Sequence, residues 1–387
     1  MNLDRLAHRR WSDEQEALRA SATTFVEREV LPNLEEWEAA RSIPRDLHRS
    51  AAEQGFLGVS FPDEVGGAGG GLLDSVCLTE ALMEAGASGG LIASLMTHGI
   101  ALPHIARSGS ADLVDRFVRP TLAGELIGAL AITEPDGGSD VANIRTRAVR
   151  DGAHFVVNGA KTFITSGVRA DFVTTAVRTG GPGHQGISLL VVAKGTPGFS
   201  VSRQLDKMGW HCSDTAELSF TDVLVPAENL VGDEGSGFVQ IAMAFVTERV
   251  GLAVQGYSTA ARCLELAHAY AREREAFGQP LLGNQVVRHK LVEMHRKVEA
   301  ARVYTREVAR RYDGGEQPLV EALHAKRLGV DAAAYCTNEA VQIHGGTGYM
   351  HGTEVERHYR DARILGIGGG ANEVLDDLAA KLLGYLP

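Results

Sequence analysis

The chain has little that would mark it as a secreted or metal-binding protein. Only four of its 387 residues are cysteines, and they are scattered without a CxxC pair: Cys77, Cys212, Cys263 and Cys336. This pattern suits a reducing compartment and offers neither a disulfide framework nor a zinc site. We therefore expect a cytoplasmic protein with no metal centre.

Three further features are missing. The first stretch, "MNLDRLAHRRWSDEQEALRA", has no apolar core and carries acidic residues early, so neither a signal peptide nor a transit peptide is predicted. No run of about 18 apolar residues occurs, which predicts no membrane span. There is also no excess of basic residues. The formal net charge of -11 argues against nucleic acid or an anionic membrane as the main partner, although a local basic pocket stays open.

What the chain has is the make-up of an ordinary globular protein, with 44% hydrophobic and 22% charged residues. Helical spacing of apolar residues covers 12–56, with Ser12 as the expected N-cap, and 72–122, with a glycine-rich loop at 61–71 between them. Helical periodicity resumes from Gly237. We therefore expect a helical domain over 1–125, a β domain over 126–232 and a helical bundle over 233–387.

The middle segment reads as all-β because short β-branched or aromatic runs alternate with Gly, Pro, Asn and Asp. Within it, "FVVNGAKTFIT" (155–165) predicts two strands around a hairpin turn at Asn158-Gly159. Among the later helices, the one over 285–313 is expected to stop at Gly314-Gly315.

A glycine cluster near the C-terminus resembles a dinucleotide-binding fingerprint. Residues 366–371 read Gly-Ile-Gly-Gly-Gly-Ala, which satisfies G-x-G-x-x-G/A. That fingerprint needs a βαβ unit and an acidic residue about 20 positions further on. Too little chain follows Ala371 for a second strand, so a nicotinamide site is not predicted. We expect a loop before a terminal helix, where the backbone approaches something closely.

Four longer stretches carry a family resemblance: "ITEPDGGSDVANIRT" (132–146), "NGAKTFITSG" (158–167), "REREAFGQPLLGNQ" (272–285) and "QIHGGTGYMHGTEVERHYRDAR" (342–363). We expect the last two to lie on the C-terminal helices. In this order the four stretches resemble the acyl-CoA dehydrogenase family of FAD enzymes over essentially the whole chain. The resemblance implies an α+β fold: an N-terminal helical domain, a central β-barrel-like domain and a C-terminal four-helix bundle.

The resemblance also implies where FAD would bind. Ile132 and Thr133 would lie at the flavin ring, and Gly138 and Ser139 would meet the pyrophosphate through N–H and hydroxyl donors. Phe163 and Thr165 would wall the flavin and hydrogen-bond its reactive edge, although many members have Trp where this chain has Phe163. Taken alone, the Gly-Gly-Ser-Asp run would indicate only a turn.

A second set of residues resembles those that reach the FAD of a neighbouring subunit, which implies a homo-oligomer, a dimer or tetramer. Its members are Arg274, Phe277, Gln285, Gln342, Gly345 and Gly346, and the family also places Ala371 and Glu373 near FAD. Arg suits a pyrophosphate because its fork matches two oxygens. This chain departs from the family's sequence pattern at two positions. Ala276 stands where a hydroxyl residue is common, and Gly352 stands where the family has an acid or Asn.

The family's reaction needs a carboxylate base that removes the α-proton of an acyl thioester. Many members carry this glutamate at the position matching Gly369, where glycine cannot serve. A second group, including the isovaleryl and long-chain types, carries it on an earlier helix, at the position of Glu248. Alone, Glu248 would indicate an exposed or ion-paired carboxylate. With Gly369 it is our predicted base, and Glu373 is the runner-up.

The resemblance further assigns Ser139, Arg249 and Gly369 to the substrate, with the Gly369 N–H hydrogen-bonding the thioester oxygen. The implied function is FAD-dependent α,β-dehydrogenation of an acyl-CoA in fatty acid metabolism, with electrons passed to an electron-transfer flavoprotein. Moving the base to Glu248 would free space near Gly369, which favours branched or long acyl chains. No catalytic role is assigned to Asp140, His344 or His351.

Three alternatives stay open. The enzyme could act on an acyl or aminoacyl group tethered to a carrier protein. It could be an oxidase or hydroxylase whose reduced flavin reacts with oxygen. It could also be a non-enzymatic scaffold, against which the intact FAD motifs and Glu248 argue.

Overall fold

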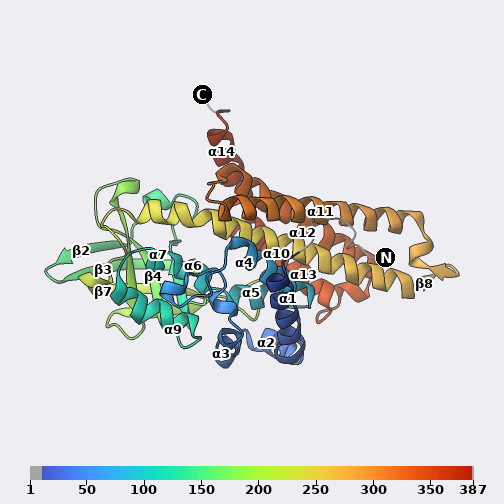
Figure 1. The fold of residues 1–387 in the computed structure, drawn as a ribbon, viewed down its shortest axis with the longest axis horizontal. Helices are drawn as coiled ribbons and strands as arrows, with labels where there is room; N and C mark the ends of the chain where they lie inside the picture. Colours follow the sequence, from blue (N-terminus) through green and yellow to red (C-terminus); the bar gives the residue numbers. More distant parts are fainter. Residues whose placement is uncertain (1–10, 386–387) are drawn as a thin grey trace.

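A computed structural model describes residues 11–385, and it shows the expected order of helices, sheet and helices. Figure 1 shows the sheet at one end of an elongated molecule, with the long C-terminal helices running from it to the opposite end. The N-terminal helices pack along one side of this arrangement. The first ten residues, where the absence of a signal peptide was predicted, lie outside the described range.

The N-terminal part is built from helices, three of which begin at a serine cap: Ser12, Ser88 and Ser110. Ser12 caps the first helix as expected: its hydroxyl accepts from the Gln15 amide at 3.2 Å, while the Gln15 side chain accepts from the Ser12 amide at 3.1 Å. The helices are α1 (Asp13–Phe25), α2 (Leu34–Ala40), α3 (Asp46–Glu53), α4 (Leu72–Glu84), α5 (Gly89–Leu95), α6 (His98–Ala101), α7 (Pro103–Ala106), α8 (Ala111–Leu113) and α9 (Arg119–Leu122).

A buried polar cluster joins α4 to the C-terminal helices. The Glu80 carboxylate accepts from Arg306 Nε at 2.9 Å and from the Tyr257 hydroxyl at 2.6 Å, and all three side chains are buried. The paired guanidinium holds the pKa of Glu80 below its usual value, against the opposing effect of burial. Because each charge is paired and hydrogen-bonded, the cluster orients α4 across the bundle without leaving an uncompensated ion.

Seven strands form one mixed sheet in the order β1-β4-β2-β3-β7-β6, with β5 paired to β4. One face packs on the short helices around Phe117, and the other faces its own curled interior around Phe155. The strands β4 and β5 are buried over almost their whole length, and both carry mostly apolar residues. The strands are β1 (Gly128–Ala131), β2 (Arg147–Asp151), β3 (His154–Thr165), β4 (Phe172–Arg178), β5 (Ile187–Ala193), β6 (Phe199–Gln204) and β7 (Thr215–Pro226).

The hairpin turn predicted at Asn158-Gly159 was wrong, because β3 continues through it. The pairing of β3 with β7 shifts register between Val157 and Gly159, which marks a bulge rather than a turn. Gly159 has φ +151°, and a Cβ there would lie 2.7 Å from the Thr146 Cα. Asn158 donates to the Asp222 carboxylate at 3.0 Å on the partner strand. The Asn-Gly pair therefore serves a bulge where neighbouring backbone comes close.

The C-terminal part is a bundle of α10 (Gly237–Glu273), α11 (Gln285–Asp313) and α12 (Leu319–His344), with α13 (Glu354–Ala362) against α12 and α10. The helix α11 ends at Gly314, as predicted. The helix α14 (Asn372–Leu382) packs its Leu375 on α12 and projects from the body (Figure 1). Within the described residues, α10 alone is long and apolar enough to cross a membrane, yet it packs against α4, α11 and α12 as a central bundle helix.

The stretch 272–285 was expected on a helix, and this was wrong for most of it. The helix α10 ends at Glu273, and a small hairpin of β8 (Glu275–Ala276) and β9 (Gln279–Pro280) forms the turn to α11. Phe277 and Gly278 at its tip both have positive φ, which is incompatible with a continuing helix.

Two glycines set the closest approach of α10 and α12. A Cβ at Gly256 would lie 2.5 Å from the Gly329 carbonyl oxygen, and one at Gly329 would lie 2.5 Å from the Ala253 carbonyl oxygen. We predict that Gly256→Ala lowers the free energy of unfolding by about 1–3 kcal/mol through overpacking. The measurement is denaturant-induced unfolding followed by circular dichroism.

Gly251→Ala is the matched control on the same helix, because a Cβ there meets nothing within 4 Å. It should raise stability by about 0.5–1 kcal/mol, the usual gain of Ala over Gly in a helix. Equal effects of the two substitutions would contradict the close-approach interpretation.

Candidate active site

Glu248 and Gly369 lie side by side although they are far apart in the chain. A Cβ built on Gly369 would stand 3.2 Å from the Glu248 Oε1 and 3.7 Å from the Lys326 Nζ. The glycine loop between α13 and α14 thus approaches the middle of α10, as expected for a loop that must come close to something. A glutamate at position 369 would therefore start from a point close to the Glu248 carboxylate.

The side chain of Leu252 lies beside Gly369. A Cβ at this position would lie 2.3 Å from the Leu252 Cδ1, one helical turn after Glu248. Gly369 also has φ +62°, so a side chain there would be strained as well as obstructed. The end of the Leu252 side chain thus occupies part of the room that a glutamate at 369 would take, and the preference for branched or long acyl chains stays a prediction.

Lys326 on α12 binds the backbone of the glycine loop. Its fully buried ammonium donates to the carbonyl oxygens of Gly368 and Gly370, the second at 2.6 Å. Burial lowers the pKa of Lys326 to about 8, although the nearby Glu248 carboxylate opposes the shift. This side chain fixes the loop and places a positive charge beside Glu248.

The Glu248 carboxylate has no hydrogen bond to any described residue. Burial raises its pKa, and the positive charges of Lys326 and Arg249 only partly offset this. The Arg249 guanidinium lies 4.8 Å from the Phe245 ring centroid, and its Nε is buried without a partner among residues 11–385. A carboxylate with a raised pKa and no competing partner is suited to accept a proton near neutral pH.

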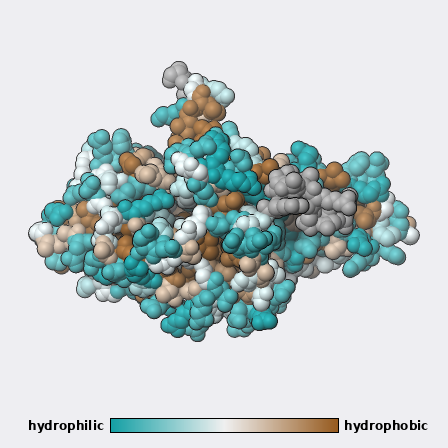
Figure 2. Space-filling view, viewed as in Figure 1, coloured by the Kyte–Doolittle hydropathy of each residue, from teal (hydrophilic) through white to brown (hydrophobic). Residues whose placement is uncertain are grey.

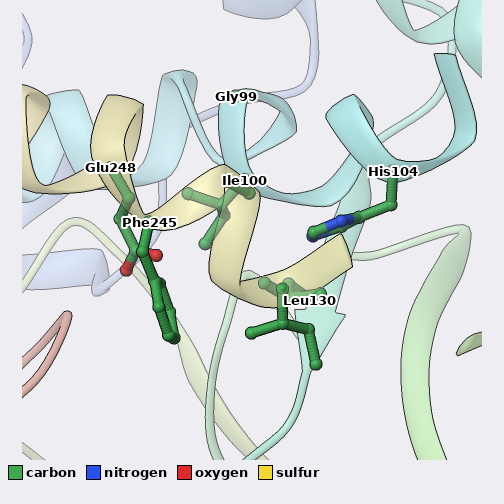
Figure 3. A pocket seen from close by; sticks show the side chains of 8 residues that line it. Gly99, Ile100, His104, Leu130, Phe245 and Glu248 are labelled. Carbon is green, nitrogen blue, oxygen red and sulfur yellow. The ribbon is translucent and has the colours of Figure 1, made fainter. Parts of the chain in front are cut away.

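Glu248 lines a cavity formed by four elements. Ile241, Ala244, Phe245 and Glu248 come from α10, Gly99 and Ile100 from α6, His104 from α7 and Leu130 from β1. In Figure 3 the carboxylate of Glu248 and the ring of His104 stand at opposite sides of the lining, with Ile100 between them. The wall is mostly apolar, with the Glu248 carboxylate at one end and the His104 imidazole at the other.

The loop after β1 is locked to β3 by a buried ion pair. Lys161 Nζ donates to Glu134 Oε1 at 2.8 Å and to the Ile132 carbonyl at 2.8 Å. Glu134 in turn accepts from the Arg145 and Thr146 amides at 2.6 and 2.9 Å. This network fixes both ends of the 132–146 loop.

The predicted residues Thr133, Phe163 and Thr165 belong to this same region. The Thr162 amide donates to the Thr133 carbonyl at 2.9 Å, which sets the loop against the strand that carries Phe163 and Thr165. Phe163 is 68% exposed and has φ +60°, an unusual conformation for an aromatic residue. Such strain at an exposed ring indicates that the ring serves something outside the chain's own core.

The pyrophosphate end of the predicted cofactor site is also open. Neither Gly138 nor Ser139 uses its backbone N–H in a hydrogen bond to a described residue, and both residues are exposed. A free N–H pair next to a hydroxyl fits phosphate oxygens. The unpaired donors and the exposed Phe163 therefore fit a flavin nucleotide laid along the loop, with Ile132 partly buried behind it.

The second predicted set lies at the far end of the bundle. Arg274, Phe277 and Gln285 are all exposed on the α10–α11 turn, and Gln342, Gly345 and Gly346 end α12. The two groups share one end because Tyr270 stacks on His344, with ring centroids 4.3 Å apart. Along α10, Arg274 is roughly 39 Å from Glu248 at 1.5 Å per residue. Within one chain the structure therefore does not bring this set to the Glu248 cavity.

The remaining predicted residues follow the glycine loop. Ala371 precedes α14, and Glu373 lies exposed in its first turn. Glu373 is not among the residues that line the cavity with Glu248, which makes it the poorer candidate for the base.

Sequence reasoning missed Lys326, the Glu134–Lys161 pair and His104. One signal was present for the lysines, because each interrupts an otherwise apolar face of its helix or strand. Nothing in the sequence indicated that His104 would face the cavity.

Comparison with known proteins agrees with this architecture. Residues 12–125, 129–223 and 235–384 match the models of the acyl-CoA dehydrogenase N-terminal, middle and C-terminal domains. The chain belongs to the acyl-CoA dehydrogenase family. It is thus an oxidoreductase that acts on acyl-CoA with FAD as its cofactor, as the fit of the loop indicates.

Individual relatives span nearly the whole chain. Mitochondrial isobutyryl-CoA dehydrogenase of Bos taurus is 36% identical over 96% of this chain and 89% of its own. Mitochondrial long-chain specific acyl-CoA dehydrogenase of Rattus norvegicus is 35% identical over 96% and 86%. A crystal structure of an acyl-CoA dehydrogenase from Mycobacterium smegmatis is 58% identical, with a TM-score of 0.97 over 97% of this chain and 99% of that one.

The buried pair behind the FAD loop gives a testable consequence. Lys161→Met leaves the Glu134 carboxylate buried without its counter-ion, so we expect the free energy of unfolding to fall by about 3 kcal/mol and FAD to be retained less well. Arg203→Met, which breaks the more exposed pair with Glu217, is the control and should cost under about 1 kcal/mol. Similar losses in both variants, measured by thermal unfolding and flavin content, would contradict this role.

Proposed function

We propose that the protein catalyses α,β-dehydrogenation of an acyl-CoA thioester with Glu248 as the base. The observation that carries the proposal is the Glu248 carboxylate itself. It has no hydrogen bond to a described residue, a raised pKa and a place at the cavity beside the glycine loop. The product is the trans-2-enoyl thioester.

In this proposal the chain's own residues divide the work. Glu248 takes the α-proton. The neighbouring positive charge of Lys326 limits the rise in the pKa of Glu248, so that the protonated side chain can release the proton again. The Gly369 N–H has no hydrogen bond to a described residue, so it is free to donate to the thioester oxygen and stabilise negative charge there. When bound, FAD supplies the acceptor for the hydride that leaves the β-carbon. The acyl chain enters the apolar cavity along α10.

We further propose that two copies of the chain complete each FAD site. The exposed residues at the α10–α11 turn lie too far from Glu248 to reach the same FAD molecule in one chain, so a neighbour must present them. Figure 2 shows hydrophobic residues gathered on the projecting C-terminal helix, where Val374, Leu382 and Leu383 are exposed. An apolar helix standing out from the body supports association into a dimer or tetramer.

An electron-transfer flavoprotein is the proposed acceptor of the electrons, in keeping with the family. The cytoplasmic location and the place in fatty acid metabolism stay predictions.

The role of Glu248 is tested by anaerobic bleaching of the flavin absorbance with isobutyryl-, octanoyl- and palmitoyl-CoA. We expect Glu248→Gln to slow bleaching by at least about 100-fold, the usual contribution of a positioned base. In the unchanged enzyme the rate should fall as the pH drops through the raised pKa of Glu248, because only the ionised form accepts the proton. Glu265→Gln, an exposed carboxylate on the same helix, should leave the rate unchanged.

Stability offers a second readout of the same group. A carboxyl whose pKa is raised on folding loses folding free energy when it ionises, so Glu248→Gln should stabilise the protein above the raised pKa and have no such effect below the usual carboxyl pKa. Bound flavin that no acyl-CoA bleaches would overturn the proposed substrate, and carrier-protein thioesters would then be tried.

The shared site predicts complementation between two defective variants. Glu248→Gln and Arg274→Ala should each have little activity alone. Co-expressed with different tags and purified as a mixed oligomer, they should regain activity, because sites with an intact Glu248 can receive an intact Arg274 from the partner copy. Activity no higher than the sum of the separate variants would show that Arg274 does not serve a neighbour's FAD.

A further inference from the structure

His104 stands out among the buried histidines because nothing in the described chain satisfies it. Its side chain is only 4% exposed, and its Nε2 has no hydrogen-bond partner among residues 11–385. Buried polar atoms are normally paired, since an unpaired one loses its bond to water without replacement. His98, an equally buried neighbour, shows the usual arrangement: its Nε2 lies 2.8 Å from the Leu57 carbonyl.

The ring of His104 faces the same cavity as Glu248. Of the described residues that line this cavity, only Glu248 and His104 have polar side chains, and the rest are Ile, Leu, Phe, Ala or Gly. Figure 3 shows the imidazole reaching into the space beside Ile100 and Leu130, toward the side of the cavity where Glu248 lies. An isolated polar group in an apolar wall fixes which part of a ligand can lie next to it.

The charge state of His104 narrows the chemistry of that ligand. Burial lowers the pKa of His104 to about 4, and the positive charge of Arg107 acts in the same direction, so the ring is neutral near neutral pH. A neutral imidazole offers one N–H donor and one acceptor nitrogen. A carboxylate would find no counter-charge in this lining and would face the Glu248 carboxylate, so a neutral oxygen fits better.

The distance along α10 indicates where this oxygen would stand on the acyl chain. The cavity residues of this helix run from Ile241 to Glu248, a rise of roughly 10 Å. Since Glu248 takes the α-proton in the proposed reaction, a group at His104 lies well beyond the reacting carbons.

From this geometry we propose that His104 recognises a neutral oxygen, a hydroxyl or carbonyl, near the distal end of the acyl chain, so that the substrates are oxygenated acyl thioesters. The proposal rests on the proposed function, because it takes Glu248 to mark the α-carbon. His104 is then a residue that determines specificity and takes no part in the proton or hydride transfer.

The test compares matched pairs of thioesters on the purified FAD enzyme. Straight acyl-CoAs from hexanoyl to decanoyl are set against the same chains with a hydroxyl or a keto group at or next to the chain end, and kcat/KM is measured with an artificial electron acceptor. We expect at least one oxygenated chain to be favoured by at least about ten-fold over its plain counterpart. His104→Phe, which keeps a flat ring without nitrogen, should abolish that preference and raise activity on the plain chain.

Two further variants separate recognition from packing. His104→Gln keeps a donor and an acceptor and should retain part of the preference for the oxygenated chain. Ile100→Val widens the same cavity without changing its polarity, so it should alter the preferred chain length and leave the preference for oxygen intact. Neither variant touches Glu248 or the FAD loop.

The outcomes are distinct. A wild-type enzyme that processes plain chains at least as well as every oxygenated partner would overturn the proposal and indicate that His104 binds only water. Equal changes for both substrates in His104→Phe would do the same. Failure of the proposed function looks different, because then no thioester of either kind would reduce the flavin in any variant.

Discussion

The glycine loop is held in place by one buried ammonium group. Lys326 satisfies two loop carbonyls and at the same time lies close to Glu248 on the neighbouring helix. A lone buried lysine would lose its charge, and a lone buried carboxylate would gain a proton. Together they offset each other in part, so the loop can sit against α10 while the carboxylate stays free of hydrogen bonds. The position of Gly369 beside Glu248 depends on this contact, and the ammonium group limits how far burial raises the pKa of Glu248.

Two kinds of polar group can be compared in the described part of the chain. Glu80 and Glu134 are paired with Arg306 and Lys161 and accept further hydrogen bonds, so they orient one element on another. The half-buried Glu248 carboxylate and the buried His104 Nε2 have no hydrogen bond to any described residue, and both residues line the same cavity. Because an unpaired buried polar group is costly, its presence at a cavity points to a ligand more strongly than its residue type does.

The length of α10 has consequences for assembly. The helix runs from the sheet, past Glu248, to the exposed turn with Arg274 and Phe277 (Figure 1). One end of the helix carries exposed residues that resemble cofactor ligands, and a carboxylate without a hydrogen bond lies near the other end. The two groups can serve one site only if two copies of the chain pack against each other. Phe277 at the turn and Phe163 on β3 are both exposed aromatic residues with positive φ. Such strained, uncovered rings fit surfaces that are covered by a cofactor or another subunit.

Much of the fold could be predicted because it rests on local patterns. Apolar spacing predicted the helices, alternating runs predicted the sheet, and the Ser12 cap and the Gly314 stop follow from side-chain and glycine chemistry within a few residues. The pairing of Glu248 with Gly369 was also inferred before any contact was known, but from family resemblance rather than from spacing. Local patterns failed at Asn158-Gly159 and at 274–280, where close backbone on a partner strand and a tight turn overrode them.

The sequence by itself determined the order of the elements and the chemical groups available, since these follow from residues close together in the chain. Only the tertiary structure decided that Leu252 lies beside Gly369, that Lys326 lies close to Glu248, and that His104 lines the same cavity as Glu248. Each of these contacts joins elements that the sequence separates by many residues. Their geometry depends on how α6, α7, α10 and α12 pack, which no local pattern specifies.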